Sequence, residues 1–222
     1  MQNIDKCWYR GVCSSVSDTC EKFCPKYIEM RYLMDSSNIP RNKQKPIVLM
    51  PSQCDVKAFD RLASIKDNIV DFVEQGKNLY ITSSTVGNGK TSWSLKLLMK
   101  YFEEIWEGNG LEPRGLIVHV PTFLLKCKDF KTEDEAFTNL KKLALSVDLV
   151  VWDDIGGVTM SNYDYSQLLA YLDAREFGGL SNIFTGNITS RSDLEQALGA
   201  KITSRIWNSN TEVIEFFGGE RR

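Results

Sequence analysis

The stretch from Thr82 to Trp93 reads TSSTVGNGKTSW, and it decides what kind of fold this chain can form. It ends in Gly-Lys-Thr, as phosphate-binding loops do, although such a loop carries glycine where this chain has Ser84. A short apolar segment, residues 79–82, precedes the stretch, and apolar residues at helical spacing follow it. A strand before and a helix after are the context in which this pattern binds phosphate. The stretch therefore predicts a nucleotide phosphate site, with a glycine-rich turn before a helix as the alternative.

Each part of this loop has an expected chemical task. The backbone N–H groups of residues 87–91 would converge on phosphates at the positive end of the helix dipole. Glycines at 87 and 89 permit backbone angles and a close approach that a Cβ would block. Lys90 is expected to reach the β- and γ-phosphates, and the Thr91 hydroxyl to bind Mg²⁺. The predicted ATP-binding residues of the loop are Ser84, Gly87, Asn88, Gly89, Lys90, Thr91 and Ser92.

Two further polar sites follow predicted strands. The segment LVVWDDIGG (residues 149–157) ends a buried strand in two acids, and NIFTGN (residues 182–187) ends another strand in Asn187. Because ligands bind at the carboxyl ends of parallel strands, Asp153 is expected to hold Mg²⁺ and Asp154 to orient or deprotonate the attacking water. Asn187 is expected near the γ-phosphate. The alternatives are two acids that cap the next turn and an asparagine in an ordinary turn.

Apolar strands alternate with helical segments along the rest of the chain. Helices are expected over residues 55–73, 91–106, 163–177 and 192–207, with two more between residues 121 and 147. Strands are expected over residues 79–82, 115–120, 148–152, 182–185 and 211–217. Continuous apolar strands between helices predict an α/β fold, with a parallel sheet covered on both faces. His119, the only histidine, lies between two valines of a predicted strand and is interpreted as structural.

Composition and charge limit the classes of function. The chain has 222 residues, of which 42% are apolar and 25% charged, as in ordinary globular proteins. Its net charge of −2 argues against a surface coated in positive charge, but a local basic groove stays compatible with it. We find no apolar run of the ~18 residues that a membrane span needs and no signal peptide. A cytoplasmic protein without a membrane partner is therefore expected.

Four of the six cysteines lie at the start of the chain, in the pattern C-x5-C-x6-C-x3-C. In a cytosolic protein such clustering favours metal binding over disulfides. Four thiolates satisfy a tetrahedral Zn²⁺ site, which would supply folding energy to a segment too short for a core. Reduced free cysteines and an iron–sulfur cluster are the alternatives. The predicted zinc ligands are Cys7, Cys13, Cys20 and Cys24.

The motifs GNGKT, VVWDDIG and FTGN, in this order and spacing, resemble those of an AAA+ ATPase. The DDIG ending and the segment LGAKITSRIW before a final strand and GGERR resemble the DnaC/DnaI replicative-helicase loaders of bacteria and phages, with the IstB transposition helpers as relatives. The resemblance covers roughly residues 36–222. It implies an AAA+ core with a five-stranded parallel sheet and without a C-terminal lid. The expected domains are a zinc-binding, partner-docking module (residues 1–35), an adenine-wrapping linker (36–54) and the ATPase domain (55–222).

The resemblance also implies roles for single residues. Lys90 and Thr91 match Walker A; Asp153 and Asp154 match Walker B, with aspartate in place of the commoner glutamate; and Asn187 matches sensor 1. Arg205 matches the arginine finger that reaches a neighbouring subunit's γ-phosphate, and Arg175 matches another arginine near the subunit interface. Asn38, Ile39 and Pro40 resemble the segment that wraps adenine. The helical region between residues 121 and 147 would contact DNA through Lys126, Lys128, Phe130 and Lys131.

The function that the resemblance implies is ATP-dependent loading of a replicative DNA helicase onto single-stranded DNA in the bacterial cytosol, as in a phage-type system. The active form would be a homo-oligomer, an open ring or spiral, with ATP, Mg²⁺ and Zn²⁺ as cofactors. One alternative is an IstB-like transposition helper that binds a transposase and duplex DNA. Another is a zinc-bearing adaptor that binds ATP and hydrolyses it weakly. A small-molecule kinase is less favoured, since no basic lid motif is found.

Overall fold

A parallel sheet forms the centre of the molecule. The computed structural model describes residues 7, 10–11, 13–14, 16–17, 20, 24–105, 111–129 and 135–219. Within them, the strands form one five-stranded sheet in the order β2-β3-β4-β1-β5, and all neighbouring strands are parallel. The strands are β1 (Asn78–Thr82), β2 (Gly115–His119), β3 (Leu149–Ile155), β4 (Ser181–Gly186) and β5 (Thr211–Glu215). The predicted α/β fold with a parallel sheet is confirmed.

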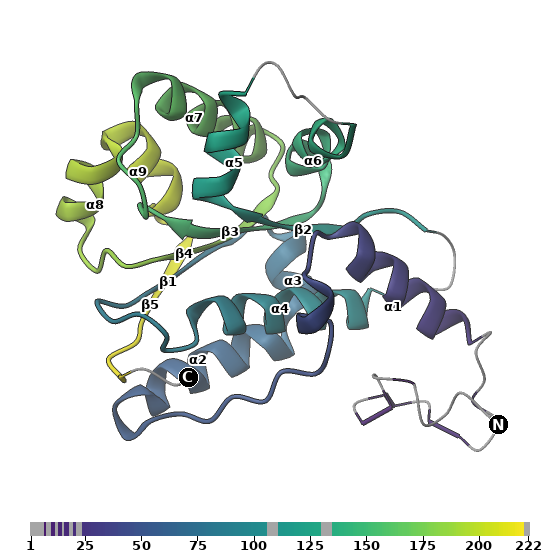
Figure 1. Ribbon diagram of the computed structural model, residues 1–222. Helices are drawn as coiled ribbons and strands as arrows, with labels where there is room; N and C mark the ends of the chain where they lie inside the picture. Colours follow the sequence, from purple (N-terminus) through teal and green to yellow (C-terminus); the bar gives the residue numbers. More distant parts are fainter. Residues whose placement is uncertain are drawn as a thin grey trace.

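Helices cover both faces of this sheet in two layers (Figure 1). The layer drawn below the sheet holds α1 (Pro25–Ser36), α2 (Val56–Asp67), α3 (Ile69–Glu74) and α4 (Lys90–Glu104). The layer drawn above it holds α5 (Val120–Cys127), α6 (Glu135–Ser146), α7 (Asn162–Phe177), α8 (Arg191–Leu198) and α9 (Ala200–Ile206). Short 3-10 turns, η2 (Arg41–Lys43) and η3 (Gln53–Asp55), interrupt the chain between α1 and α2. None of the described helices has both the length and the apolar character needed to cross a bilayer.

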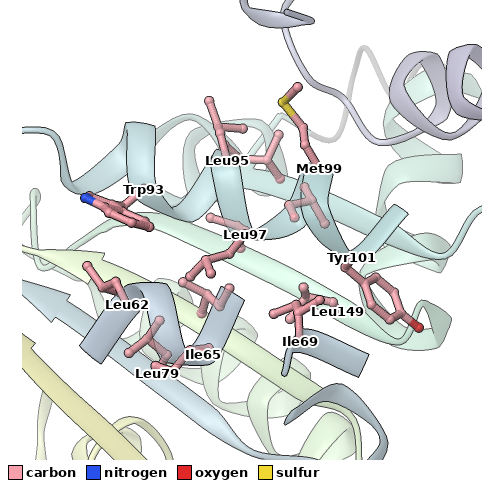
Figure 2. Close-up of a cluster of buried hydrophobic side chains, with 14 of the residues drawn as sticks. Leu62, Ile65, Ile69, Leu79, Trp93, Leu95, Leu97, Met99, Tyr101 and Leu149 are labelled. Carbon is pink, nitrogen blue, oxygen red and sulfur yellow. The ribbon is translucent and has the colours of Figure 1, made fainter. Parts of the chain in front are cut away.

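Alternate residues of each strand point into the two layers, because successive side chains of a strand face opposite sides of the sheet. Leu79 and Ile81 of β1 pack with α1–α4, whereas Tyr80 between them packs with α5–α9. Figure 2 shows the first of these clusters, where Trp93, Leu97 and Tyr101 of α4 lie over the sheet beside side chains of α2 and α3. Burial on both faces explains why the strands are continuously apolar.

Two predicted helices are each divided in the structure. The segment predicted as one helix over residues 55–73 breaks at Asn68, whose φ of −122° and ψ of 33° are not helical. The segment over residues 192–207 breaks at Gly199, which has a φ of +79°. A side chain at Gly199 would be strained by this φ, and its Cβ would lie 3.1 Å from the Tyr165 ring. After these breaks α3 packs against α4 and β4, and α9 packs against α7 and α8.

Helix α1 was not predicted. Its buried residues, Met30, Leu33 and Met34, belong to the cluster of the α1–α4 layer. Directly after α1, the Ile117 N–H donates to the Ser37 carbonyl (2.9 Å), and the Asn38 side chain donates to the Ile117 carbonyl (3.0 Å). Since β2 lies at the edge of the sheet, this segment satisfies polar groups that would otherwise be open to another strand.

Arg175 holds the amino ends of β3 and β4 together, and its predicted role near a subunit interface does not fit this position. Its side chain is 0% exposed. The guanidinium donates to the side chain of Asn182 (2.6 Å) and to the carbonyls of Ala144 (3.1 Å), Val147 (2.9 Å), Asp148 (3.3 Å) and Ser181 (2.6 Å). Burial lowers the pKa of Arg175 to about 9, against the raising effect of Asp148, so the guanidinium stays charged at neutral pH.

Replacing Arg175 should therefore cost stability. We expect Arg175→Ala to lower the free energy of unfolding by roughly 3 kcal/mol or more, because it leaves several buried carbonyls without donors. Urea denaturation measures the change, and Arg191→Ala on the exposed start of α8 is the control. An unchanged stability combined with lost nucleotide hydrolysis would instead indicate a role at the site.

Candidate nucleotide site

A loop of residues 83–89, here called the phosphate loop, connects β1 to α4. Gly87 has a φ of +73° and Gly89, which caps α4, a φ of +100°. Ser84 is exposed at the start of the loop and does not have a positive φ. Serine is tolerated there because the left-handed angles fall on the two glycines further along. The loop therefore has the glycines where its backbone needs them, despite the missing first glycine.

The side chains of the loop brace one another. Asn88 is fully buried, and its amide donates to the hydroxyls of Ser83 and Thr85, the latter at 3.1 Å. The Lys90 ammonium donates to the Thr85 carbonyl (2.9 Å) and the Asn88 side chain (3.3 Å). Burial lowers the pKa of Lys90, and the nearby Asp154 and Asp153 act against that shift. A partly desolvated ammonium beside the loop is suited to bind a phosphate.

Asp153 connects the loop to the neighbouring strands. One of its carboxylate oxygens, Oδ1, accepts from the Thr91 hydroxyl in the first turn of α4 and from the Thr185 hydroxyl in β4, both at 2.7 Å. Hydroxyl and carboxylate oxygens are the hard ligands that Mg²⁺ prefers. Thr91 and Asp153 thus fit the predicted magnesium site in both position and donor type.

Asp154 follows in an unusual backbone conformation. Its φ is +62°, and the pairing of β3 with β4 is irregular between Trp152 and Ile155. The Asp154 N–H donates to the Thr185 hydroxyl (3.0 Å), while its carbonyl accepts from the Gly157 N–H (3.2 Å). Non-glycine residues with such angles concentrate at functional sites, where the surrounding structure holds them. This irregularity turns Asp154 out of the strand beside Asp153.

His119 lies at the same edge of the sheet as the acids, and its interpretation as a structural residue stays a prediction. It is the last residue of β2, opposite Asp153 in the pairing, and its side chain is 50% exposed. The imidazole Nε2 lies 4.0 Å from the Asp154 carboxylate, and Nδ1 lies 2.8 Å from the Thr122 hydroxyl. The signal that could have identified it is its place at the carboxyl end of a strand next to the acidic one.

The loop after β4 lies at the same edge. Asn187 follows the last residue of β4 directly and is exposed. Two side chains of β1 fix the position of the next residue, Ile188, because the hydroxyls of Tyr80 and Thr82 both donate to its carbonyl at 2.7 Å. Burial raises the pKa of Tyr80, so this hydroxyl keeps its proton. The carboxyl ends of three adjacent strands, β3, β4 and β1, thus supply Asp153, Asn187 and the phosphate loop.

Other predicted site residues lie apart from this group. Arg205 of α9 pairs with Asp173 (2.7 Å) and Glu176 (2.8 Å) of α7, and its hydrogen bond to Asp173 is the main cause of its raised pKa. Asn38 and Ile39 contact the edge strand and the core, which gives no support to their role around adenine. Leu49, which was not predicted as a site residue, lies beside the phosphate loop, because a Cβ built on Gly89 would be 4.0 Å from its side chain.

The cysteines give no support to the zinc prediction. Cys7, Cys13, Cys20 and Cys24 are all free cysteines, and among the described residues no group of three or more His, Cys, Asp or Glu side chains could hold a metal. Cys7 and Cys13 instead pack against the core of the α1–α4 layer. Burial against apolar side chains explains the presence of these two residues without a metal.

The predicted DNA contacts are engaged within the chain where they are described. The Lys126 ammonium lies over the Phe137 ring, 5.6 Å from its centre. Lys128 pairs with Asp164 at 2.6 Å. Burial would raise the pKa of Asp164, but its bonds to Lys128 and Ser161 keep that pKa below its usual value. Phe130 and Lys131 lie outside the described residues.

The structure thus combines a five-stranded parallel sheet, helices on both of its faces and a phosphate loop between β1 and α4. No protein-family model and no curated protein matches the chain. Solved structures with this fold include the DnaC helicase loader (TM-score 0.63, 19% identity, 77% of this chain and 94% of that one). DnaI also matches, with a TM-score of 0.63 and 21% identity over 81% of this chain and 95% of that one. A candidate primosome component from Streptococcus pyogenes serotype M3 matches with a TM-score of 0.59 and 22% identity, over 86% of this chain and 98% of that one. The chain therefore has the fold of the DnaC and DnaI helicase loaders.

The loop geometry leads to a paired prediction. Ser84→Gly should leave the affinity for ATP within about twofold, because the position needs no left-handed backbone. Gly89→Ala should weaken binding at least tenfold, because alanine at a φ of +100° is strained and shifts the start of α4. Titration with a fluorescent ATP analogue measures both. Equal effects of the two substitutions would contradict this account of the loop.

Proposed function

We propose that this chain is an AAA+ ATPase that loads a replicative DNA helicase onto single-stranded DNA. The observation that carries the ATPase part is the contact of Asp153 with Thr91 beside the phosphate loop, which brings a magnesium ligand pair next to a phosphate cradle. The loading role rests on the fold shared with the DnaC and DnaI helicase loaders. Helicase, single-stranded DNA and further copies of this chain are the proposed partners, in a cytoplasmic setting.

Each group at the site has its own task. Backbone N–H groups at the start of α4 and the Lys90 ammonium would bind the phosphates. Thr91 and Asp153 would hold Mg²⁺, which offsets the negative charge of the phosphates when bound. Asp154, turned toward the same space, would orient the attacking water and take up its proton. His119, 4.0 Å from the Asp154 carboxylate, and Thr185, which accepts from the Asp154 N–H, would keep that acid in position.

Lys90→Ala tests the nucleotide site directly. We expect at least a hundredfold loss of ATP affinity, because the variant lacks the charge closest to the phosphates, while urea denaturation should show a nearly unchanged stability. Isothermal titration with ATP and Mg²⁺ measures binding, and a helicase-loading assay on single-stranded DNA should fail in parallel. Retained tight binding would remove the phosphate-loop assignment. A lost affinity combined with normal loading would remove the loader role alone.

Arg205 tests whether a second copy completes the site. Its guanidinium is held by two acids of α7, Asp173 and Glu176, and is about one-third exposed. Arg205→Ala should reduce ATP hydrolysis at least tenfold and leave ATP binding within about twofold. If the arginine acts across an interface, a mixture of Arg205→Ala and Lys90→Ala chains should regain part of the activity. A mixture as inactive as its components would restrict each residue to its own chain.

An IstB-like transposition helper is the alternative. It predicts binding to a transposase and to duplex DNA in place of a helicase and a single strand. The sheet and the phosphate loop suit both proposals equally, so the choice between them depends on the DNA form and the protein that the chain binds.

A further inference from the structure

A groove of about 450 Å³ lies on the outer side of the α1–α4 layer, away from the residues assigned to the nucleotide. One wall is an extended segment before α2, and the other is the exposed side of α4 with the last turn of α2. The lining residues are Pro46, Ile47, Val48, Lys66, Lys96, Met99, Lys100 and Glu103.

Positive charge exceeds negative charge along this groove. Its lining includes three lysines and one glutamate. Lys66 pairs with its chain neighbour Asp67 (2.8 Å), and Lys100 pairs with Glu103 (3.5 Å) and Glu104. Lys96 differs, because no carboxylate within the described part of the chain pairs with it. An anion in the groove would give Lys96 the partner that the chain does not supply.

The surroundings of Lys96 support this interpretation. Its ammonium lies over the ring of Trp93, 5.1 Å from the ring centre, so the side chain lies against α4, which carries both residues. Burial, and then the positive charge of Lys66, lower its pKa. The positive charge of Lys66 disfavours the charge on Lys96, and a bound carboxylate would relieve that repulsion.

The other wall of the groove is apolar and open. Val48 is 82% exposed although it lies between residues that pack on the core, and Met50 beyond it is 75% exposed. Ile47 and Met99 complete the apolar side. An exposed apolar surface of this kind next to Lys96 suits a ligand with both an acidic and an apolar side chain.

A nucleic acid fits this groove less well than a peptide does. Phosphate backbones need a continuous track of cations, and single strands also use aromatic side chains on which bases stack. Here the cations span a short distance and end among Asp67, Glu103 and Glu104, which would repel further phosphates. The lining contains no aromatic side chain.

From this combination we infer that the groove between α2, α4 and residues 46–48 docks a short acidic and apolar peptide segment of a protein partner. A carboxylate of the segment lies between Lys66 and Lys96, and a neighbouring apolar side chain covers Val48 and Met99. This site does not depend on the nucleotide function, since it uses neither the phosphate loop nor the acids after β3.

Selection from a displayed library of random twelve-residue peptides tests the inference on the full chain. Peptides enriched on the wild-type chain should carry glutamate or aspartate beside leucine, isoleucine or valine. A synthetic peptide of the enriched sequence, labelled for fluorescence polarisation, should bind Lys96→Glu and Lys66→Glu at least tenfold more weakly. Lys142→Glu, the same charge change on the exposed side of α6, should bind it as the wild type does.

Two controls keep the result interpretable. Urea denaturation of each variant should match the wild type, which shows that the charge reversals leave the fold intact. Val48→Asp, at an exposed position, should also weaken peptide binding without changing the stability. Absence of enrichment, enrichment of basic peptides, or an equal loss in Lys142→Glu would overturn the inference. Displacement of the peptide by an equimolar single-stranded oligonucleotide would overturn it in favour of nucleic acid.

Discussion

The rest of the site depends on the hydrogen bonds that Asp153 accepts from Thr91 and Thr185. These bonds connect the first turn of α4, the end of β3 and the strand between them. The sheet order makes this possible: β4 lies between β1 and β3, so the Thr185 hydroxyl near its end lies beside the acids of β3. Thr185 also accepts from the Asp154 N–H, which fixes the second acid relative to the first. A different strand order would separate the loop from the acids, whatever their spacing in the sequence.

The two ends of the sheet serve opposite purposes. The carboxyl end carries side chains that are open to a ligand, while the amino end is closed by Arg175 and its five hydrogen bonds. Helix α7 explains the location of Arg175. A crossover helix begins near the carboxyl end of one strand and returns to the amino end of the next, so a residue in its last turn lies far from the ligand edge. The order of strands and helices along the chain is therefore enough to place Arg175 away from the nucleotide.

The sequence predicted those parts of the structure that a local pattern of residues determines. Apolar strands, helical spacing and the Gly-Lys-Thr ending predicted the sheet and the phosphate loop, since each pattern reflects burial or backbone geometry over a few residues. Contacts between distant segments were not predictable in the same way. Helix α1 depends on packing against α4, and His119 acquires its neighbour from the next strand. The breaks at Asn68 and Gly199 end helices whose apolar spacing continues across them. The cysteine spacing suggested a metal, whereas Cys7 and Cys13 contact the core.

The backbone conformation at position 154 explains why this chain has aspartate there and not glutamate. The pattern that the chain resembles has glutamate there more often, and a shorter acid reaches less far toward a water molecule. However, the irregular pairing of β3 puts this residue at a φ of +62°, a region that aspartate and asparagine visit more readily than longer side chains do. Gly157 fits the same arrangement, because a Cβ there would lie 2.3 Å from the Asp154 carboxylate. The left-handed backbone places the carboxylate beside Gly157 and His119, where a short side chain suits the distorted end of the strand.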